Sequence, residues 1–406
     1  MSEKSRKMSK FRLGFLTVLI VIAVTFTVAA RVMAADKEPI LIGQVGDLTS
    51  PSSFAGISFR DGVRDWFSLV NKKGGFTGRE VKILFTDGAY DLSRETAAFK
   101  KYSMENIVAF FDWSSGGALQ ISPLCAEKKI VNFGGGINEA MSDTNKYPYR
   151  FLHCASYEQS LRVCIDYQIA KHPGKKQTAA IVYPDSGYGH IMLKALREHL
   201  SKRDIAIVTE EIVNYSALDS STQMLKVKAA NPDFVVTLQT VPVTAMILKD
   251  AVKVGIDTKK MQFYNNLSGA GYELPTLAGD AGKDFLLGIS FSDTSEPDVP
   301  GIKQLLDLHA GKQWRPTSTS WYLSGWVAAR VLSEGLKTTV DKGEKVTGEN
   351  VKKNLETLKD FHNDGLTSPI TFSPSRHIGA YGVKLARPNL KKMEGLEVIS
   401  DWIYPK

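Results

Sequence analysis

The chain consists of short apolar runs separated by longer amphipathic stretches. Ile40 to Val45 is a largely apolar run of strand length, and Ser58 to Asn71 places Val63, Phe67 and Val70 at the spacing of one helix face. A lysine-glycine-glycine sequence follows this second stretch and is typical of a helix end. The pattern therefore predicts a strand and then a helix at the start of the folded chain.

Further apolar runs predict more strands of the same kind. They are Val81 to Thr86, Ile107 to Asp112, Ile130 to Phe133, Thr178 to Tyr183, Ile205 to Thr209, Phe234 to Leu238 and Gln262 to Tyr264. Enough chain separates these runs for crossover helices. Strands that alternate with helices predict an α/β fold with parallel sheets covered on both faces.

A weak internal repeat relates two parts of this pattern. The unit with strands Val81 to Phe85 and Ile107 to Phe111 returns about 125 residues later as Ile205 to Val208 and Phe234 to Val236. Two similar doubly wound, Rossmann-like units predict two lobes. Ligands of such sheets bind beyond the carboxyl ends of the strands, so we expect a ligand cleft between the lobes.

The N-terminal segment has the pattern of a cleaved secretory signal peptide. Five basic residues precede an uncharged apolar run from Leu13 to Val28, and Val32 and Ala34 suit a signal peptidase site. The alternative is an uncleaved membrane anchor, but the run is shorter than the roughly 20 residues that span a bilayer. We therefore expect residues 1–34 to be removed near Ala34 or Ala35, which leaves an exported protein in a bacterial periplasm.

Composition excludes several classes of function. The net charge of +8 includes +5 from residues 1–34, so the remainder carries about +3 and is not basic enough to indicate nucleic-acid binding. No cysteine precedes Cys125, which excludes a lipid attached to the new N-terminus. Cys154 and Cys164 can form a disulfide in an oxidising compartment or remain buried thiols, and the sequence leaves both open.

Three segments resemble a known family in their order and spacing. They are Ile42-Gly43-Gln44-Val45-Gly46-Asp47-Leu48-Thr49-Ser50-Pro51, Asn71-Lys72-Lys73-Gly74-Gly75-Phe76-Thr77-Gly78-Arg79 and Asp185-Ser186-Gly187-Tyr188-Gly189. The chain resembles the type I periplasmic solute-binding proteins of branched-chain amino acid (leucine/isoleucine/valine) ABC importers over nearly all of its mature length. The resemblance implies lobe I from residues 36–154 and 290–366, lobe II from residues 155–289 and 367–406, and a hinge of three crossing segments.

The same resemblance implies a function of capture and delivery. We expect a monomer that closes its lobes on a small amino acid or organic acid and delivers it to an inner-membrane ABC permease, with no cofactor and no metal. Alternatives are a ligand-binding sensor module of the same fold and an exported hydrolase. The sequence lacks H-E-x-x-H, G-x-S-x-G, P-loop and G-x-G-x-x-G motifs, which disfavours an enzyme.

Polar residues after two strands are candidate ligand contacts. Ser114 and Ser115 follow the strand that ends at Asp112 and precede a predicted helix, where hydroxyls, free N–H groups and the helix dipole can hold an anion. Helix capping alone is the alternative, and the resemblance implies that Ser115 holds a ligand carboxylate. Gly136 and Asn138 lie after the next strand, in a glycine-rich segment that is either a close approach to ligand or a flexible turn.

Further candidates lie in the second predicted lobe and in the C-terminal part of the chain. The resemblance implies that Tyr188 closes over the ligand. Gln239 and Thr240 occupy the repeat position of the serine pair and are therefore candidates as polar contacts. Trp326 is the second choice of aromatic contact after Tyr188, ahead of Tyr157, Trp113, Phe54 and Tyr322, although aromatic residues are more often part of the core.

One departure from the family pattern bears on the ligand. Amino-acid-specific relatives place an acid after the strand equivalent to Gln262 to Tyr264, where it pairs with the ligand ammonium. Here Asn265 and Asn266 are followed by Leu267 and a serine, and no acid is present. Burying an unpaired ammonium is costly. Either another acid such as Asp112 or Glu273 pairs with an ammonium, or the ligand is a carboxylate or amide without one, with both asparagines as candidate contacts.

Overall fold

The computed structural model describes residues 38–311 and 318–405. The predicted signal peptide and its cleavage site lie outside these ranges. Among the helices of the described ranges, none is long and apolar enough to cross a membrane.

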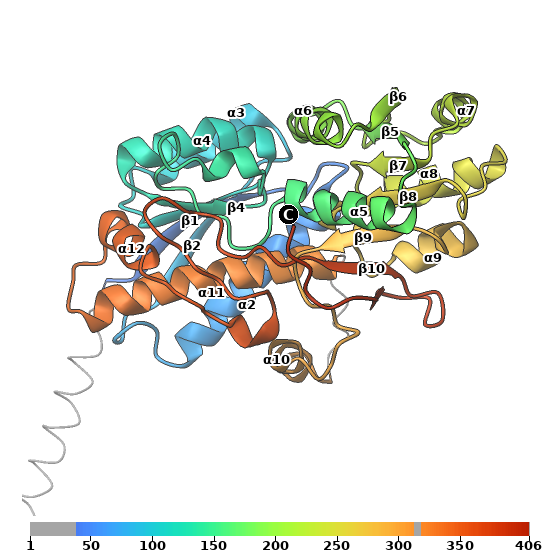
Figure 1. Ribbon diagram of the computed structural model, residues 1–406. Helices are drawn as coiled ribbons and strands as arrows, with labels where there is room; N and C mark the ends of the chain where they lie inside the picture. The colour runs from blue at the N-terminus through green and yellow to red at the C-terminus, as the bar shows by residue number, and fades with distance from the viewer. Residues whose placement is uncertain (1–37, 312–317, 406) are drawn as a thin grey trace, which may run out of the picture.

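Two separate sheets organise the described chain (Figure 1). The first has the strand order β2-β1-β3-β4, and the second has the order β11-β10-β9-β8-β7-β5-β6. The first sheet consists of β1 (Ile40–Gly46), β2 (Val81–Asp87), β3 (Ala109–Asp112) and β4 (Val131–Gly134). The second consists of β5 (Thr178–Tyr183), β6 (Ala206–Ile212), β7 (Phe234–Thr237), β8 (Gln262–Asn265), β9 (Leu286–Ile289), β10 (Lys384–Pro388) and β11 (Leu396–Val398). All pairings are parallel except those of β10 with its two neighbours.

Helices cover both faces of each sheet. We call the first sheet and the helices packed on it lobe I; these helices are α2 (Ser53–Lys72), α3 (Leu92–Tyr102), α4 (Ser115–Lys128), α11 (Thr319–Asp341) and α12 (Gly348–Leu355). Lobe II is the second sheet with α5 (Tyr157–Lys171), α6 (Gly187–Lys202), α7 (Ser221–Ala230), α8 (Val241–Lys253) and α9 (Leu274–Ala278). The remaining elements are helix α10 (Pro300–Leu308) and four short 3₁₀ helices. These are η1 (Glu139–Ser142), η2 (Leu267–Gly269), η3 (Gly279–Gly282) and η4 (Asn363–Gly365). The α/β class predicted from the sequence is confirmed.

The chain passes between the lobes three times. It leaves lobe I after β4, returns to it after β9, and leaves it again after α12 to form β10. In Figure 1, α11 lies beside α2 under the first sheet although more than 200 residues separate them along the chain. The predicted lobe boundaries fall at residues 154, 290 and 366, inside these passages, and their exact positions stay a prediction.

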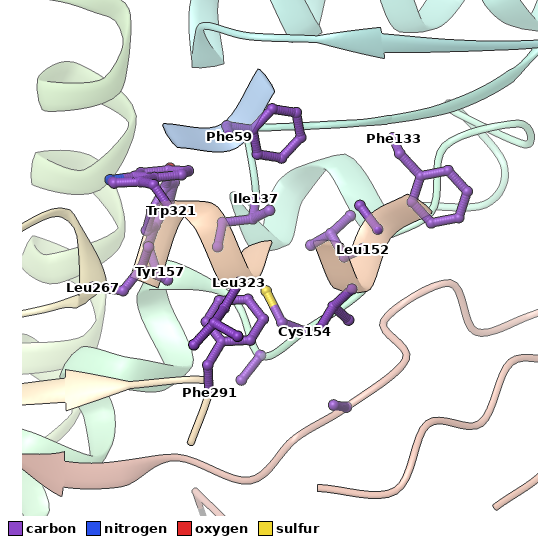
Figure 2. Close-up of a cluster of buried hydrophobic side chains, with 14 of the residues drawn as sticks. Phe59, Phe133, Ile137, Leu152, Cys154, Tyr157, Leu267, Phe291, Trp321 and Leu323 are labelled. Atoms are coloured by element: carbon purple, nitrogen blue, oxygen red, sulfur yellow. The ribbon is translucent and has the colours of Figure 1, made fainter. Parts of the chain in front are cut away.

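The hydrophobic core continues from one lobe to the other through these passages. Figure 2 shows Phe133 of β4 and Leu323 of α11 in the same buried cluster as Phe291, which follows β9. Cys154 lies in this cluster as well, and all three cysteines are buried free thiols. Of the two options that the sequence left open for Cys154 and Cys164, the structure shows the unpaired one.

The structure differs from the expected elements at a few places. Helix α2 begins at Ser53 rather than Ser58, because Asp47 binds the hydroxyls of Ser50 and Ser52 and fixes the turn before the helix. Strands β9, β10 and β11 were not expected. β11 has three residues and β10 contains a lysine, an arginine and a proline, so periodicity gives little signal for these two strands, whereas β9 is a four-residue apolar run that was overlooked.

Candidate ligand-binding site

A small cavity of about 40 Å³ lies where the two lobes meet. This volume is below the roughly 300–1,000 Å³ of most small-molecule sites, so the cavity must widen to admit a small organic ligand. The cavity is lined by Ser52, Ala55, Tyr90, Trp113, Ser114, Ser115, Gly135, Tyr157, Tyr188, Tyr215, Thr240, Ser268 and Trp321. The site is therefore built from both lobes at the carboxyl ends of their strands, where a doubly wound sheet binds its ligand.

Six helices begin at this cavity. The lining residues include the N-cap or first residue of α2, α4, α5 and α8, the second residue of α6 and the third residue of α11. The N-terminus of a helix carries free N–H groups and roughly half a positive charge from the helix dipole. The backbone alone therefore makes the cavity favourable for an anion.

The two serines at the start of α4 have different roles. Ser114 is the N-cap, and its Oγ accepts a hydrogen bond from the Gly117 N–H at 2.9 Å. Ser115 is the first helical residue, and its hydroxyl has no hydrogen bond to any described residue while its side chain lines the cavity. The capping alternative thus describes Ser114, and the Ser115 hydroxyl remains available to a ligand.

The lobe II side of the cavity is built from the starts of α6 and α8 and from the turn after β8. Tyr188 is the second residue of α6, and its hydroxyl lies 3.1 Å from Ser268 Oγ and 2.9 Å from Asn266 Nδ2. Thr240 is the N-cap of α8 without a side-chain cap hydrogen bond. The Thr240 hydroxyl is therefore a second free polar group, opposite Ser115.

Aromatic rings form most of the cavity wall. Trp321 contacts Trp113 with ring centroids 5.2 Å apart, and Tyr157 contacts Tyr188 at 5.0 Å. Figure 2 shows Trp321 and Tyr157 close together at one end of the buried cluster. The Tyr157 hydroxyl donates to the Gly135 carbonyl at 2.6 Å, so this ring presents carbon surface rather than a hydroxyl to the cavity. The wall thus suits a flat or branched apolar group.

No side chain that lines the cavity is acidic or basic within the residues that the structure describes. Asp112, one candidate partner for a ligand ammonium, is buried behind the cavity and binds Arg150 and Asn132. Glu273, the other candidate, is exposed at the start of α9. Neither carboxylate lies at the cavity.

Glu95 is the acid closest to the start of α4. Its Oε2 accepts a hydrogen bond from the Ser114 N–H at 3.3 Å, and its side chain is fully buried. Burial raises the pKa of Glu95 to about 8, and the negative charges of Asp112 and Asp47 add to the shift, although hydrogen bonds from Ser114 oppose it. This carboxyl is therefore mostly protonated at neutral pH and does not offer a charge to an ammonium.

The structure brings four of the predicted site residues together at the cavity: Ser114, Ser115, Tyr188 and Thr240. Gly136, Gln239, Asn265 and Asn266 lie just behind them and bind other protein groups. The Gly136 carbonyl accepts from Arg150, and the Gln239 side chain donates to the Val213 carbonyl. Asn265 and Asn266 hold the turn that presents Ser268. These residues support the cavity rather than line it.

Asn138 and Trp326 lie elsewhere. Asn138 lines a separate groove between η1 and helices α5 and α6 and donates to Glu158. Trp326 is fully buried in lobe I against Trp66 and Tyr322. Trp321 lies at the cavity in place of Trp326, because five residues along a helix turn the side chain by about 140°.

Sequence reasoning missed several lining residues, among them Tyr90, Tyr215, Ser52 and Trp321. Tyr90 follows the end of β2, and Tyr215 follows the end of β6. The rule that ligands bind beyond the carboxyl ends of strands pointed to both loops. Trp321 had no comparable signal, because the contact of α11 with the cavity depends on the return of the chain to lobe I.

The two lobes touch at the edge of the cavity. A methyl group added at Gly187, the first residue of α6, would lie 3.1 Å from the Cα atom and 3.2 Å from the backbone nitrogen of Gly116 in α4. Asn138, before η1, also contacts Met192 of α6. The structure therefore has the lobes together rather than apart.

The described chain offers no cluster of three or more His, Cys, Asp or Glu side chains that could hold a metal ion. The free groups at the cavity are hydroxyls and backbone N–H groups. Such groups bind and orient a ligand, but they supply neither a nucleophile with an adjacent base nor a metal.

Comparison with known families accounts for this arrangement. Residues 39–392 match the family described as "Periplasmic binding protein". The chain belongs to the periplasmic binding protein family. This is a family of periplasmic solute-binding proteins rather than of enzymes, and the family predicted from the sequence is confirmed.

Relatives of this periplasmic binding protein include proteins named for branched-chain amino acids. The Leu/Ile/Val-binding protein of Escherichia coli strain K12 is 23% identical over 308 residues, which cover 76% of this chain and 82% of the relative. Leu/Ile/Val-binding protein homolog 7 of Brucella abortus strain 2308 is 22% identical over 315 residues, covering 75% of this chain and 78% of the relative.

Solved structures share the two-lobed fold. A branched chain amino acid ABC transporter protein from Thermus thermophilus with bound valine has a TM-score of 0.82 at 23% identity, and covers 91% of this chain and 97% of that chain. A fatty acid ABC transporter substrate-binding protein from Thermomonospora curvata has a TM-score of 0.80 at 17% identity, covering 91% and 94%. The type I periplasmic binding protein fold predicted from the sequence is confirmed.

Proposed function

We propose that this protein is the substrate-binding component of an ABC importer, and that it captures a small organic acid by lobe closure and delivers it to an inner-membrane permease. Family membership and the cavity between the lobes support capture. The names of the similar proteins support import, since they include ABC transporter components. We expect the ligand to be released unchanged, because the described residues of the cavity offer neither a nucleophile with an adjacent base nor a metal site.

The observation that carries the ligand class is the charge of the cavity. Six helix N-termini begin there, and none of its described lining side chains is charged. A carboxylate is stabilised by the free N–H groups and helix dipoles. An α-ammonium gains no partner and is placed in a positive potential, which costs free energy. A carboxylate or comparable acceptor without an ammonium therefore fits best.

The fold alone leaves the ligand class open. The Thermus thermophilus structure contains valine, and the Thermomonospora curvata protein is named for a fatty acid. Both have this fold, so the lining residues must make the distinction. Here we propose that Ser115 and Thr240 bind the carboxylate, while the rings of Trp321, Tyr157 and Tyr188 surround an aromatic or aliphatic body.

Thermal-shift screening of the purified mature protein tests this function. We expect stabilisation by simple aromatic or aliphatic acids and little by leucine, isoleucine or valine, since a ligand stabilises the state that it binds. Calorimetry then gives the affinity, and recovery of unchanged ligand excludes turnover. Submicromolar binding of leucine, isoleucine or valine contradicts the proposed ligand class.

Export is proposed together with this function. Cleavage near Ala34 or Ala35 gives a mature chain without a lipid anchor, which we expect in the periplasmic fraction as a monomer. Intact-mass analysis and light scattering of that fraction test both points. A full-length chain found only in membranes contradicts the export proposal.

A further inference from the structure

Two of the described residues that line the cavity are partly exposed to solvent. Of the thirteen residues that line it, eleven are buried, and the two that are partly exposed are Tyr90 and Tyr215. A residue that lines a cavity and is also exposed forms the wall between them. Within residues 38–311 and 318–405, two tyrosine rings therefore form the outer wall of this site.

The two rings come from opposite lobes. Tyr90 lies between β2 and α3 of lobe I, and Tyr215 lies between β6 and α7 of lobe II. Their ring centroids are 5.9 Å apart with an interplanar angle of 86°, an edge-to-face contact. Such pairs are favourable beyond the area that they bury. This contact exists only while the lobes are together.

Lobe I alone fixes the position of Tyr90. The residues Ala89 and Tyr90 have φ values of 49° and 56°, in the left-handed region that is unfavourable for side chains other than glycine. Asp87 holds this turn, since its Oδ1 accepts hydrogen bonds from the N–H groups of Ala89 at 3.0 Å and Leu48 at 2.9 Å. Strained residues of this kind persist where the surrounding structure determines them, and they cluster at ligand clamps.

Lobe II holds Tyr215 in a similar way. Asn214 Oδ1 accepts a hydrogen bond from the Asp185 N–H at 2.9 Å, which ties the loop before α7 to the start of α6. Burial raises the pKa of Tyr215, although hydrogen bonds with Ser186 and Tyr90 act in the opposite direction. The Tyr215 ring is thus anchored in lobe II and meets Tyr90 across the boundary.

We propose that Tyr90 and Tyr215 form a gate, whose two halves must separate before a ligand enters or leaves the cavity. The proposal rests on the proposed function only for the identity of that ligand. Since the ring contact exists only in the closed state, removing either ring favours the open state. Removing either ring should therefore speed the entry and exit of small molecules between the cavity and solvent.

Thiol labelling tests the gate without a ligand. Ser115→Cys places a thiol inside the cavity, while the three native cysteines are fully buried and give a low background. We expect slow reaction of this thiol with a small methanethiosulfonate reagent. Adding Tyr215→Ala or Tyr90→Ala should increase the rate about tenfold or more. Tyr404→Ala is the control, because Tyr404 is 55% exposed and far from the lining residues in sequence.

Further variants keep the test decisive if one chain folds poorly. Thr240→Cys is a second reporter from the opposite lobe, and Tyr90→Phe and Tyr215→Phe keep the ring contact while removing the hydroxyls. These variants also lose the hydrogen bond between the two tyrosine side chains, so we expect them to label faster than the original protein but more slowly than the alanine variants. The gate proposal is overturned if the cysteine at position 115 or at position 240 is labelled at the same rate with both tyrosine rings present as with both removed. The reagent is not a ligand, so this result is independent of the ligand screen.

Discussion

Ser114 and Ser115 are adjacent, but the first hydroxyl caps a helix and the second faces the cavity. Ser114 stabilises the start of α4, whereas Ser115 faces the cavity without a hydrogen bond to the described protein. Substituting one at a time separates folding from binding. This pair therefore gives a matched test of the anion site.

We expect Ser115→Ala to weaken binding of a carboxylate ligand by about 1.5–3 kcal/mol, or roughly ten- to a hundredfold, through loss of one charge-assisted hydrogen bond. Without ligand, the thermal stability of the Ser115→Ala variant should stay near that of the original protein. Ser114→Ala should instead lower the unfolding free energy by about 0.5–2 kcal/mol, because a helix cap is lost. Calorimetry and urea unfolding measure the two effects. Equal affinity of the Ser115→Ala variant for the ligand contradicts the assignment.

Ser268 is the residue of the turn after β8 that lines the cavity, so an acid there would face the ligand. Leu267 is fully buried in the core, so an acid there would be a buried charge rather than a ligand contact. Ser268→Asp should weaken binding of a simple acid at least about tenfold and improve binding of leucine. Ser268→Asn is the control of equal size. Unchanged preference in the aspartate variant, measured by calorimetry, would argue against the charge-based account.

Glu95 gives the protein a specific dependence on pH. Its pKa is about 8 in the folded protein and near the ordinary value of 4.5 in the unfolded chain, so the folded state holds a proton that the unfolded state has lost between these values. Its contribution to stability is complete below about pH 4.5 and is lost as the pH rises to about 8. Glu95→Gln cannot titrate. Between pH 5 and pH 8.5 the original protein should therefore lose stability relative to the Glu95→Gln variant. Urea unfolding of both proteins across this range measures the change. A difference in unfolding free energy that stays constant with pH contradicts the prediction.

At the scale of elements, the order of strands and helices was predictable as far as β8, whereas the return of the chain to lobe I as α11 was not. Strands such as β3 and β5 are apolar runs because both faces of a parallel sheet are buried, and this gives a strong local signal. The serine pair before α4 followed directly from that order. Trp326 was expected at the cavity and Trp321 was not considered, because only the packing of α11 on α2 decides which face of α11 meets the cavity.

The contact between α4 and α6 gives a prediction at this scale. Gly187→Ala would place a methyl group 3.1 Å from the Gly116 Cα atom, so the lobes must move apart by a few tenths of an ångström. We expect modestly weaker ligand binding, and a larger loss for Gly187→Leu, with little change in the stability of the ligand-free protein. Ser201→Ala is the control on the exposed part of α6. Ligand affinities equal to that of the original protein, measured by calorimetry, would show that this contact does not limit closure.

For the whole molecule, the lobes should separate and close around the three passages. Binding shifts the population of lobe positions only through contacts that the closed state makes and the open state lacks. We expect small-angle scattering to give a larger radius of gyration without ligand than with the best ligand from the screen. A radius that does not change with a tight ligand would indicate a rigid or already closed protein.

The late position of α11 in the chain has a consequence for synthesis. Lobe I has its whole sheet by Gly134, but its core lacks α11 until about residue 341, and lobe II lacks β10 until residue 388. At about 5–20 residues per second, roughly 10–40 s pass between synthesis of β4 and of α11. We expect the nascent chain to expose the apolar face of α2 during this time. The return of one helix from near the end of the chain should therefore delay completion of the lobe I core until most of the protein has been made.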